Sequence, residues 1–201
     1  MKTHQLFAAA IVCLGFMQAA QFAVAQNTNQ RIRGIITAVE GNVLAVKTRE
    51  GQDIKINIPD NVAVSAAKAV KLSDFKADAY VGVTARVNAA GALVASEVHA
   101  LPPAAAPGHT PWDSAPGDTM TNANMVKVVK TAAGNELTME FKGGSKQIVV
   151  PEGTPIVDFV PADKSLLVPG ASIFTGASVS PEGKITAARI SVSKDGVKPP
   201  Q

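Results

Sequence analysis

Two histidines and two acidic residues near the middle of the chain have the types and spacing that best suit chemistry. Glu97 and His99 lie two positions apart, so a β-strand would place both side chains on one face. His109 and Asp113 follow in the next segment and could fold back toward them. Because imidazole and carboxylate groups bind zinc and copper, these four residues could hold a divalent metal ion. The alternative, which we favour, is that Glu97 and His99 are exposed strand residues, since no His-x-His cluster or Met-rich tract accompanies them.

Two aromatic residues are candidates for ligand binding. Trp112 is the only tryptophan and Tyr80 the only tyrosine of the sequence. Trp112 lies in a Gly-His-Thr-Pro-Trp-Asp run, residues 108–113, that looks unlike an inert linker. The simpler interpretation of Trp112 is that its ring packs onto a barrel and fastens this run in place.

Catalysis finds little support in the sequence. No Gly-x-Ser-x-Gly elbow occurs, and Ser114, His109 and Asp113 share one Pro-rich segment where no rigid element would hold them as a triad. The single cysteine, Cys13, lies in the N-terminal segment. We therefore predict a protein that is not an enzyme and needs no cofactor, with a divalent metal ion as the alternative.

The N-terminal segment has the three parts of a secretory signal peptide. Lys2 is followed by an apolar run from Leu6 to Phe16 and then by Ala23-Val24-Ala25, which predicts cleavage after Ala25. The run is shorter than the roughly 20 residues that span a bilayer, although a retained anchor is the alternative. Residues 1–25 are thus predicted to be removed, and the product is predicted to be soluble and periplasmic.

Removal of residues 1–25 changes the composition that matters for function. It takes away Lys2 and Cys13, leaving 18 Lys+Arg against 16 Asp+Glu, a net charge of +2, and no thiol. Four of the seven phenylalanines remain beside Tyr80 and Trp112. Nucleic-acid sites need a basic groove and aromatic platforms for the bases, so we predict no nucleic-acid partner. A protein or a small ligand is the expected partner.

A repeat organises the rest of the chain. Ile56-Asn57-Ile58-Pro59-Asp60 aligns with Ile148-Val149-Val150-Pro151-Glu152 at an offset of 92. The same offset continues without a gap through apolar and glycine positions. The aligned pairs include Val64 with Ile156, Val81 with Ile173, Gly91 with Gly183, Leu93 with Ile185 and Val98 with Ile190. Such phasing indicates an internal duplication.

Each repeat has the pattern of a small β unit. Apolar residues alternate with polar ones over short runs, and Gly- or Asn-containing turns separate them. Three meandering strands, a helical turn and two further strands predict an OB-like Greek-key barrel over residues 26–101 and another over 122–194. A single β-sandwich built from both halves is the alternative. Residues 102–121 are predicted to form a Pro/Ala/Gly-rich linker or strap, and residues 195–201 a flexible tail.

Several patterns together resemble one family. The first unit carries a Gly-x-Ile-x-x-Val-x-Gly-x-x-Leu pattern from Gly34 to Leu44. The run Gly108–Asp113 and the ending Gly183–Ile190 are more specific. The chain thereby resembles exported proteobacterial proteins with tandem OB-like domains of unknown function, some of which are labelled metal-transporter components. The resemblance covers nearly all of the chain after residue 25, and it implies no catalytic residues.

The transporter label does not fit the residues. A permease needs several membrane spans, and no stretch after residue 25 is apolar and long enough for one. The Gly-rich loop of a transport ATPase is also missing. The sequence departs from the family pattern at Asp78, where a glycine usually precedes the fourth strand, as Gly170 does in the second unit. We predict a periplasmic, non-enzymatic binding or envelope-accessory protein, with a metal-binding accessory protein as the alternative.

Overall fold

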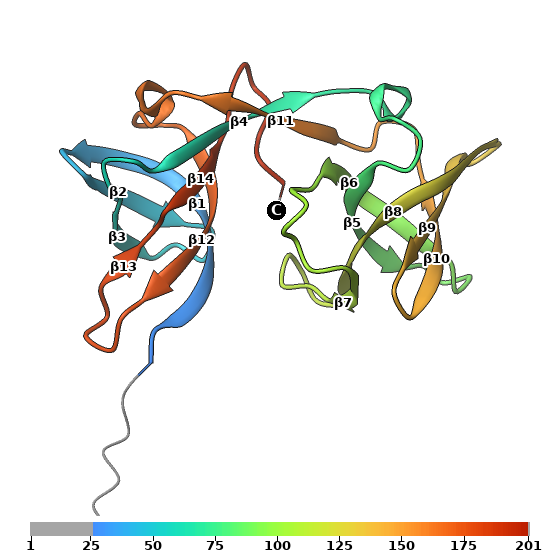
Figure 1. Ribbon diagram of the computed structural model, residues 1–201, viewed down its shortest axis with the longest axis horizontal. Helices are drawn as coiled ribbons and strands as arrows, with labels where there is room; N and C mark the ends of the chain where they lie inside the picture. Colours follow the sequence, from blue (N-terminus) through green and yellow to red (C-terminus); the bar gives the residue numbers. More distant parts are fainter. Residues whose placement is uncertain (1–25, 201) are drawn as a thin grey trace, which may run out of the picture.

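The computed structural model describes residues 26–200, and the predicted signal peptide lies outside the described residues (Figure 1). The prediction of an all-β protein is confirmed for this part, which consists of strands and two short 3-10 turns, η1 (Leu72–Asp74) and η2 (Lys164–Leu166). Both turns lie where the sequence predicts a helical or irregular crossover. Within residues 26–200, no helix has the length and apolar character needed to cross a membrane.

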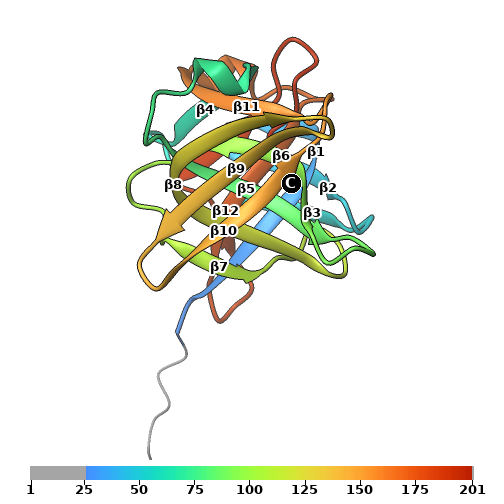
Figure 2. The same ribbon diagram turned by 90° about the vertical axis from the view of Figure 1, so that its right-hand side faces the viewer.

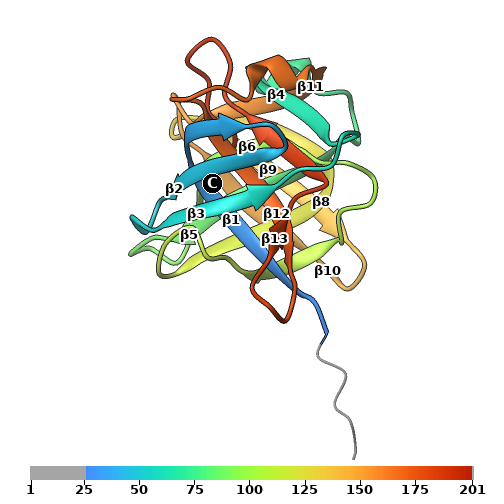
Figure 3. The ribbon, with the colours of Figure 1, turned by 90° about the vertical axis from the view of Figure 1, so that its left-hand side faces the viewer.

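The first barrel closes from strands at both ends of the described chain. Its members are β1 (Thr28–Glu40), β2 (Val43–Thr48), β3 (Asp53–Asn57), β12 (Ser172–Val179) and β13 (Ile185–Thr186). β1, β2 and β3 form the predicted antiparallel meander. β3 then pairs in parallel with β13, β13 with β12, and β12 with β1, which completes the circle (Figure 3). No edge of this circle is left open.

The second barrel is built in the same way from the middle of the chain. Its members are β5 (Tyr80–Val87), β6 (Leu93–Ala100), β8 (Asp118–Thr131), β9 (Gly134–Phe141) and β10 (Gly144–Val150). β8, β9 and β10 form a meander, β10 pairs in parallel with β6, and β5 pairs with both β6 and β8 (Figure 2). A short additional strand, β7 (Gly108–Pro111), pairs with β8.

Two strands connect the barrels. β4 (Ala63–Ala69) and β11 (Ile156–Ala162) pair antiparallel and span the two barrels at the top of Figure 1. The other edge of β4 pairs in parallel with β14 (Arg189–Val192), and the other edge of β11 pairs in parallel with β6. Each half of the chain thus builds a meander in one barrel and, after its bridge strand, delivers its last strands to the other.

The strand pairing therefore differs from the prediction that residues 26–101 and 122–194 each close a barrel of their own. The buried residues show the same exchange, because one apolar core contains Ile36 and Ile56 together with Ile173 and Ile190. The other core joins Val81 and Val98 to residues of the second half, namely Leu137, Met139 and Ile148. Because the apolar positions of the two halves align at the 92-residue offset, the sequence alone does not distinguish the two ways of pairing them.

The registers of the two barrels follow the offset seen in the sequence. Ile56 of β3 lies opposite Ile185 of β13, and Ile148 of β10 lies opposite Leu93 of β6. Adding 92 to Ile56 gives Ile148, and subtracting 92 from Ile185 gives Leu93. The same pairing thus recurs at corresponding positions of the two barrels, and the pair β4–β11 connects them (Figure 1).

One departure from the repeat pattern is accommodated without a change of backbone. Asp78 has a φ of 64°, in the left-handed region, as does Gly170 with a φ of 91° at the position 92 residues later. Aspartate is among the residues that tolerate this conformation best, although glycine adopts it at lower cost. The turn before β5 therefore matches the turn before β12.

Two predicted irregular segments are more ordered than expected. The predicted linker, residues 102–121, contains β7, and its last four residues already belong to β8. The predicted flexible tail, residues 195–201, begins with a tight turn in which Lys194 bridges to Val197, and it continues into Pro199 and Pro200, which are buried. β7 is held by its pairing with β8, and Pro200 belongs to the lining of a pocket between the barrels.

Candidate functional site

A pocket of about 590 Å³ lies between the two barrels. Its walls come from the second barrel, the first barrel, both bridge strands and the segment before β7. The residues that give it chemical character are His99, Trp112, Asn122, Phe159, Phe174 and Arg189. We call this space the inter-barrel pocket. Its volume and its mixture of aromatic rings with a few polar groups are typical of small-molecule sites.

The two barrels present different side chains to this pocket. In the second barrel, His99 lies opposite Gly82, and a Cβ on Gly82 would come within 2.5 Å of His99 Nε2, so only glycine leaves room for the imidazole. The residues 92 positions later are Phe174 and Ser191, which are paired neighbours in the first barrel. In the second barrel the large side chain is the His99 imidazole of β6, which lies opposite Gly82 of β5. At the corresponding positions 92 residues later, the large side chain is the Phe174 ring of β12, which lies opposite Ser191 of β14.

His99 is a buried and uncharged hydrogen-bonding group. It is only 7% exposed, and burial lowers its pKa from 6.5 to about 4, so the imidazole is neutral at pH 7. His99 Nδ1 lies 3.8 Å from Glu97 Oε1, which is too far for a hydrogen bond, and that oxygen accepts one from Thr84 Oγ1 at 3.0 Å. The expectation that Glu97 and His99 are exposed is wrong, because β6 is flanked by paired strands and the Glu97 side chain is 13% exposed.

Trp112 is fixed in the pocket wall by two arginines of β1. The guanidinium carbon of Arg31 lies 4.1 Å from the centroid of the Trp112 ring, and that of Arg33 lies 5.6 Å from it. Arg33 also lies 5.1 Å from the Phe174 ring. Such cation–π contacts orient the indole relative to the first barrel, although the segment that carries Trp112 leads into β8 of the second.

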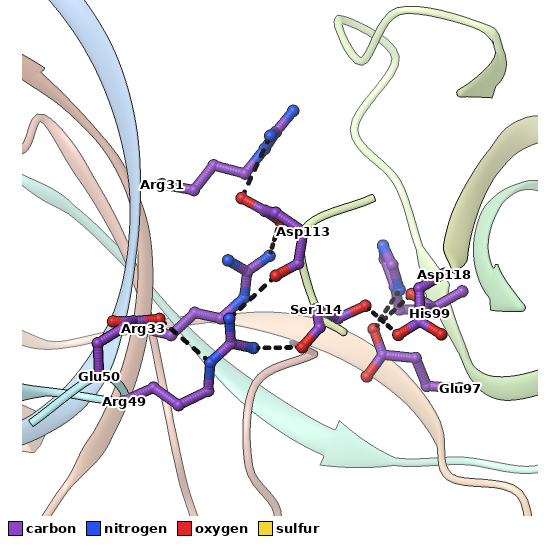
Figure 4. A network of polar contacts seen from close by, with 10 residues as sticks. Arg31, Arg33, Arg49, Glu50, Glu97, His99, Asp113, Ser114 and Asp118 are labelled. Atoms are coloured by element: carbon purple, nitrogen blue, oxygen red, sulfur yellow. Dashed lines mark hydrogen bonds and ion pairs between the residues drawn. The ribbon is translucent and has the colours of Figure 1, made fainter. Parts of the chain in front are cut away.

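The residues after Trp112 are held by three arginines of the first barrel (Figure 4). Arg33 donates a hydrogen bond of 2.8 Å to Asp113 Oδ1, and Arg31 lies 3.5 Å from Oδ2. Arg49 donates to the backbone carbonyls of Asp113 and Ser114 at 3.0 and 2.9 Å. Burial raises the pKa of Asp113, but the hydrogen bond and charge of Arg33 and the charge of Arg31 outweigh it, so that pKa lies below its usual value. This contact, which we call the arginine clamp (Arg31, Arg33, Arg49 and Asp113), joins the barrels.

Breaking the arginine clamp is expected to destabilise the protein. Asp113→Ala would leave the guanidinium of Arg33, whose side chain is 4% exposed, without its carboxylate. Because the Asp113 side chain is itself 49% exposed, we expect a loss of about 2 kcal/mol, below the range for a fully buried pair. Urea denaturation measures the loss. Arg31→Ala, which removes a half-exposed partner, should cost less than about 1 kcal/mol. Equal losses for the two variants would contradict this account of the clamp.

The remaining predicted site residues have structural partners. Tyr80 is not part of the pocket wall, and its hydroxyl donates to the carbonyl of Ala105 at 2.9 Å. His109 Nδ1 lies 2.8 Å from Thr121 Oγ1. Of the four candidate metal ligands, the structure brings only Glu97 and His99 together. Within the described chain, no group of three or more His, Cys, Asp or Glu side chains is placed to hold a metal ion.

Sequence reasoning missed most of the pocket. Asn122, Phe159, Phe174 and Arg189 line it, yet none stands in a motif. The one available signal was aromatic scarcity, because half of the six aromatic residues after residue 25 line the pocket, namely Trp112, Phe159 and Phe174. Their convergence depends on which half of the chain completes which barrel, and the repeat pattern leaves that open.

A second hollow of similar volume serves as a comparison. It runs along β8 and is lined by Lys71, Lys76, Lys127 and Lys130 over an apolar floor. It is a more open groove than the inter-barrel pocket. The three buried side-chain polar atoms that lack a hydrogen-bond partner in the described chain are Arg33 Nε, His99 Nδ1 and Asn122 Oδ1, and none belongs to this groove. Two of them belong to residues of the inter-barrel pocket. The inter-barrel pocket is therefore the better candidate.

Fold and pocket define an all-β, double-barrel protein with a ligand-sized space between its barrels. Comparison of the chain with known protein families, curated proteins and solved structures finds no match.

Proposed function

We propose that this chain is an exported, non-enzymatic binding protein that holds a small ligand in the inter-barrel pocket. The observation that carries the proposal is the pair of buried polar atoms, His99 Nδ1 and Asn122 Oδ1, that have no hydrogen-bond partner in the described chain and belong to residues lining a 590 Å³ space. Buried polar groups are nearly always hydrogen-bonded in native proteins, so unsatisfied ones beside a pocket indicate a missing partner.

The walls favour a ligand with an apolar body and a few hydrogen-bonding groups. Trp112, Phe159 and Phe174 offer aromatic surface. His99 contributes a neutral imidazole, and Arg189 a permanent positive charge. Cys13, the only cysteine, lies in the predicted signal peptide, and no Ser–His pair stands in a recognised motif, which favours binding without chemistry.

The fold and the N-terminal sequence support the rest of the proposal. The tripartite pattern of residues 1–25 favours export into the periplasm. The shared 92-residue offset of sequence and register supports an origin by duplication of an OB-like unit, whose two copies then exchanged strands. The pocket lies between the two barrels, and both halves of the chain line it.

The dye 1-anilinonaphthalene-8-sulfonate, an apolar anion, tests the proposal in the full chain without the signal. Trp112 is the only tryptophan and lines the pocket, so bound dye should accept its fluorescence energy. Gly176 also lines the pocket, and nothing lies within 4 Å of a Cβ built on it, so Gly176→Leu should fill the space without a clash. We expect this variant to lose at least about tenfold in dye affinity, equivalent to about 1.4 kcal/mol.

Gly144→Leu is the matched control. Gly144 begins β10 and is not among the residues that line the pocket, and a Cβ there meets only ordinary contacts with Phe141. This variant should bind the dye as the unaltered protein does. Equal dye binding by Gly176→Leu and the unaltered protein would overturn the proposed site, as would binding without energy transfer from Trp112.

A further inference from the structure

The end of the described chain occupies the edge of the inter-barrel pocket. Pro199 and Pro200 are buried, and Pro200 is part of the pocket lining together with Trp112, Phe159 and Phe174. Figure 1 shows this last segment, in red, returning from the top of the first barrel into the space between the two barrels. The pocket is therefore bordered by Pro200, and the buried Pro199 precedes it in the chain.

A tight turn directs this segment. After β14, the backbone N–H of Lys194 donates to the carbonyl of Val197 at 3.0 Å, and the N–H of Val197 donates back at 2.9 Å. The two residues between them, Asp195 and Gly196, have φ values of 51° and 80°, as the central residues of a type I′ turn do. The Asp-Gly pair favours this reversal, so the path of residues 197–200 back toward the pocket is set by local sequence.

Proline and aromatic rings suit one another in such a site. Proline has a fixed φ and no N–H donor, so an extended proline segment loses little conformational entropy when it binds. Aromatic-lined grooves recognise polyproline segments for this reason. The inter-barrel pocket has three aromatic side chains from three different elements, and the neutral His99 and Asn122 add hydrogen-bonding atoms for the peptide carbonyls or N–H groups.

We infer that the inter-barrel pocket recognises an extended peptide segment that contains proline, and that Pro199–Pro200 is a tethered occupant that an external segment displaces. This inference rests on the proposed function and names its ligand class. A tethered segment competes at a local concentration near the millimolar range. Removal of the tethered prolines should therefore strengthen the binding of an added peptide.

The test uses a fluorescein-labelled peptide with the sequence of residues 196–200 and fluorescence anisotropy. The double variant Pro199→Ser/Pro200→Ser should bind this peptide at least about fivefold more tightly than the unaltered protein does. A peptide with serine in place of both prolines should not bind. Gly176→Leu combined with the double variant should lose the peptide, whereas Gly144→Leu in the same background should retain it.

Three outcomes overturn the inference. Equal affinity of the unaltered protein and the double variant would show that the prolines do not occupy the pocket. Binding of the serine peptide would show that proline is not recognised. Dye binding that persists while no variant binds the proline peptide would overturn the peptide class and leave the proposed small-ligand site intact. Where circular dichroism shows that the double variant is unfolded, Pro200→Ser alone replaces it and is read by the same criteria.

Discussion

Residues 26–103 and 104–201, produced as separate polypeptides, are expected to be unfolded alone and to fold together when mixed. The reason is the exchange of strands, since β1, β2 and β3 close only against β12 and β13, which belong to the other polypeptide. In the same way β5 and β6 complete a barrel whose meander is β8, β9 and β10. Separate fragments would leave both apolar cores half built. Circular dichroism of each fragment and of the mixture, with light scattering for the stoichiometry, measures this result.

Two matched substitutions sharpen the fragment experiment. Ile173→Ala in the second fragment removes a side chain that is 1% exposed and packs with residues of the first fragment. It should weaken the complex by about 2–4 kcal/mol, the usual cost of such a truncation. Val168→Ala, at an exposed position, should have little effect. A folded fragment of residues 26–103 in the absence of its partner would contradict this account of the fold.

Acidification is expected to destabilise the protein through His99. Its pKa is lowered to about 4 in the folded state by burial, whereas an unfolded histidine has a pKa of about 6.5. Between these values the unfolded chain binds a proton that the folded protein does not, so the free energy of unfolding falls as the pH falls. For a single group the loss between pH 7 and pH 4.5 is about 2 kcal/mol. Urea denaturation at several pH values measures it.

Other groups also titrate in this range, so the comparison with His99→Gln isolates the contribution of His99. This variant should lose less stability than the unaltered protein does between pH 7 and pH 4.5. His109→Gln is the control, because the pKa of His109 is also lowered, by burial and by the charge of Lys146, but its side chain is only partly buried. It should change the pH dependence much less. Identical pH dependence of His99→Gln and the unaltered protein would contradict the burial account.

The sequence predicts the strands of this fold better than their partners. Alternating apolar residues and the 92-residue offset locate the meanders, the crossover turns and the later strands, and Ile56 and Ile148 occupy equivalent buried positions as the alignment indicates. The same offset cannot show which half completes which barrel, because Leu93 and Ile185 occupy equivalent positions of the alignment. The exchange is decided by the path of the bridge strands, which carry each half across to the other barrel.

For the candidate site, too, the sequence predicts some residues but not the contacts that they make. The sequence identifies Trp112 and His99 from their residue types, but it predicts an exposed strand residue at a position where the structure has a buried, neutral imidazole. It also assigns His109 and Asp113 to one possible metal site. In the structure the two residues have different partners, because His109 contacts Thr121 and Asp113 accepts a hydrogen bond from Arg33. The pocket lies between the two barrels, and the sequence pattern predicts each barrel without showing how the two are placed together. The other walls of the pocket therefore could not be predicted.

Strand exchange also has a consequence for the rate and order of folding. β1 pairs with β2, which follows it directly, but its other partner is β12, and Thr28 lies opposite Val179. Contacts of such large sequence separation slow folding, because long loops must close before the contacts form. A ribosome makes the chain from its N-terminus, and the first barrel cannot close until β12 and β13 have emerged. The second barrel needs only β5, β6, β8, β9 and β10, all of which precede β12 in the chain. The order of synthesis therefore favours closure of the second barrel before the first.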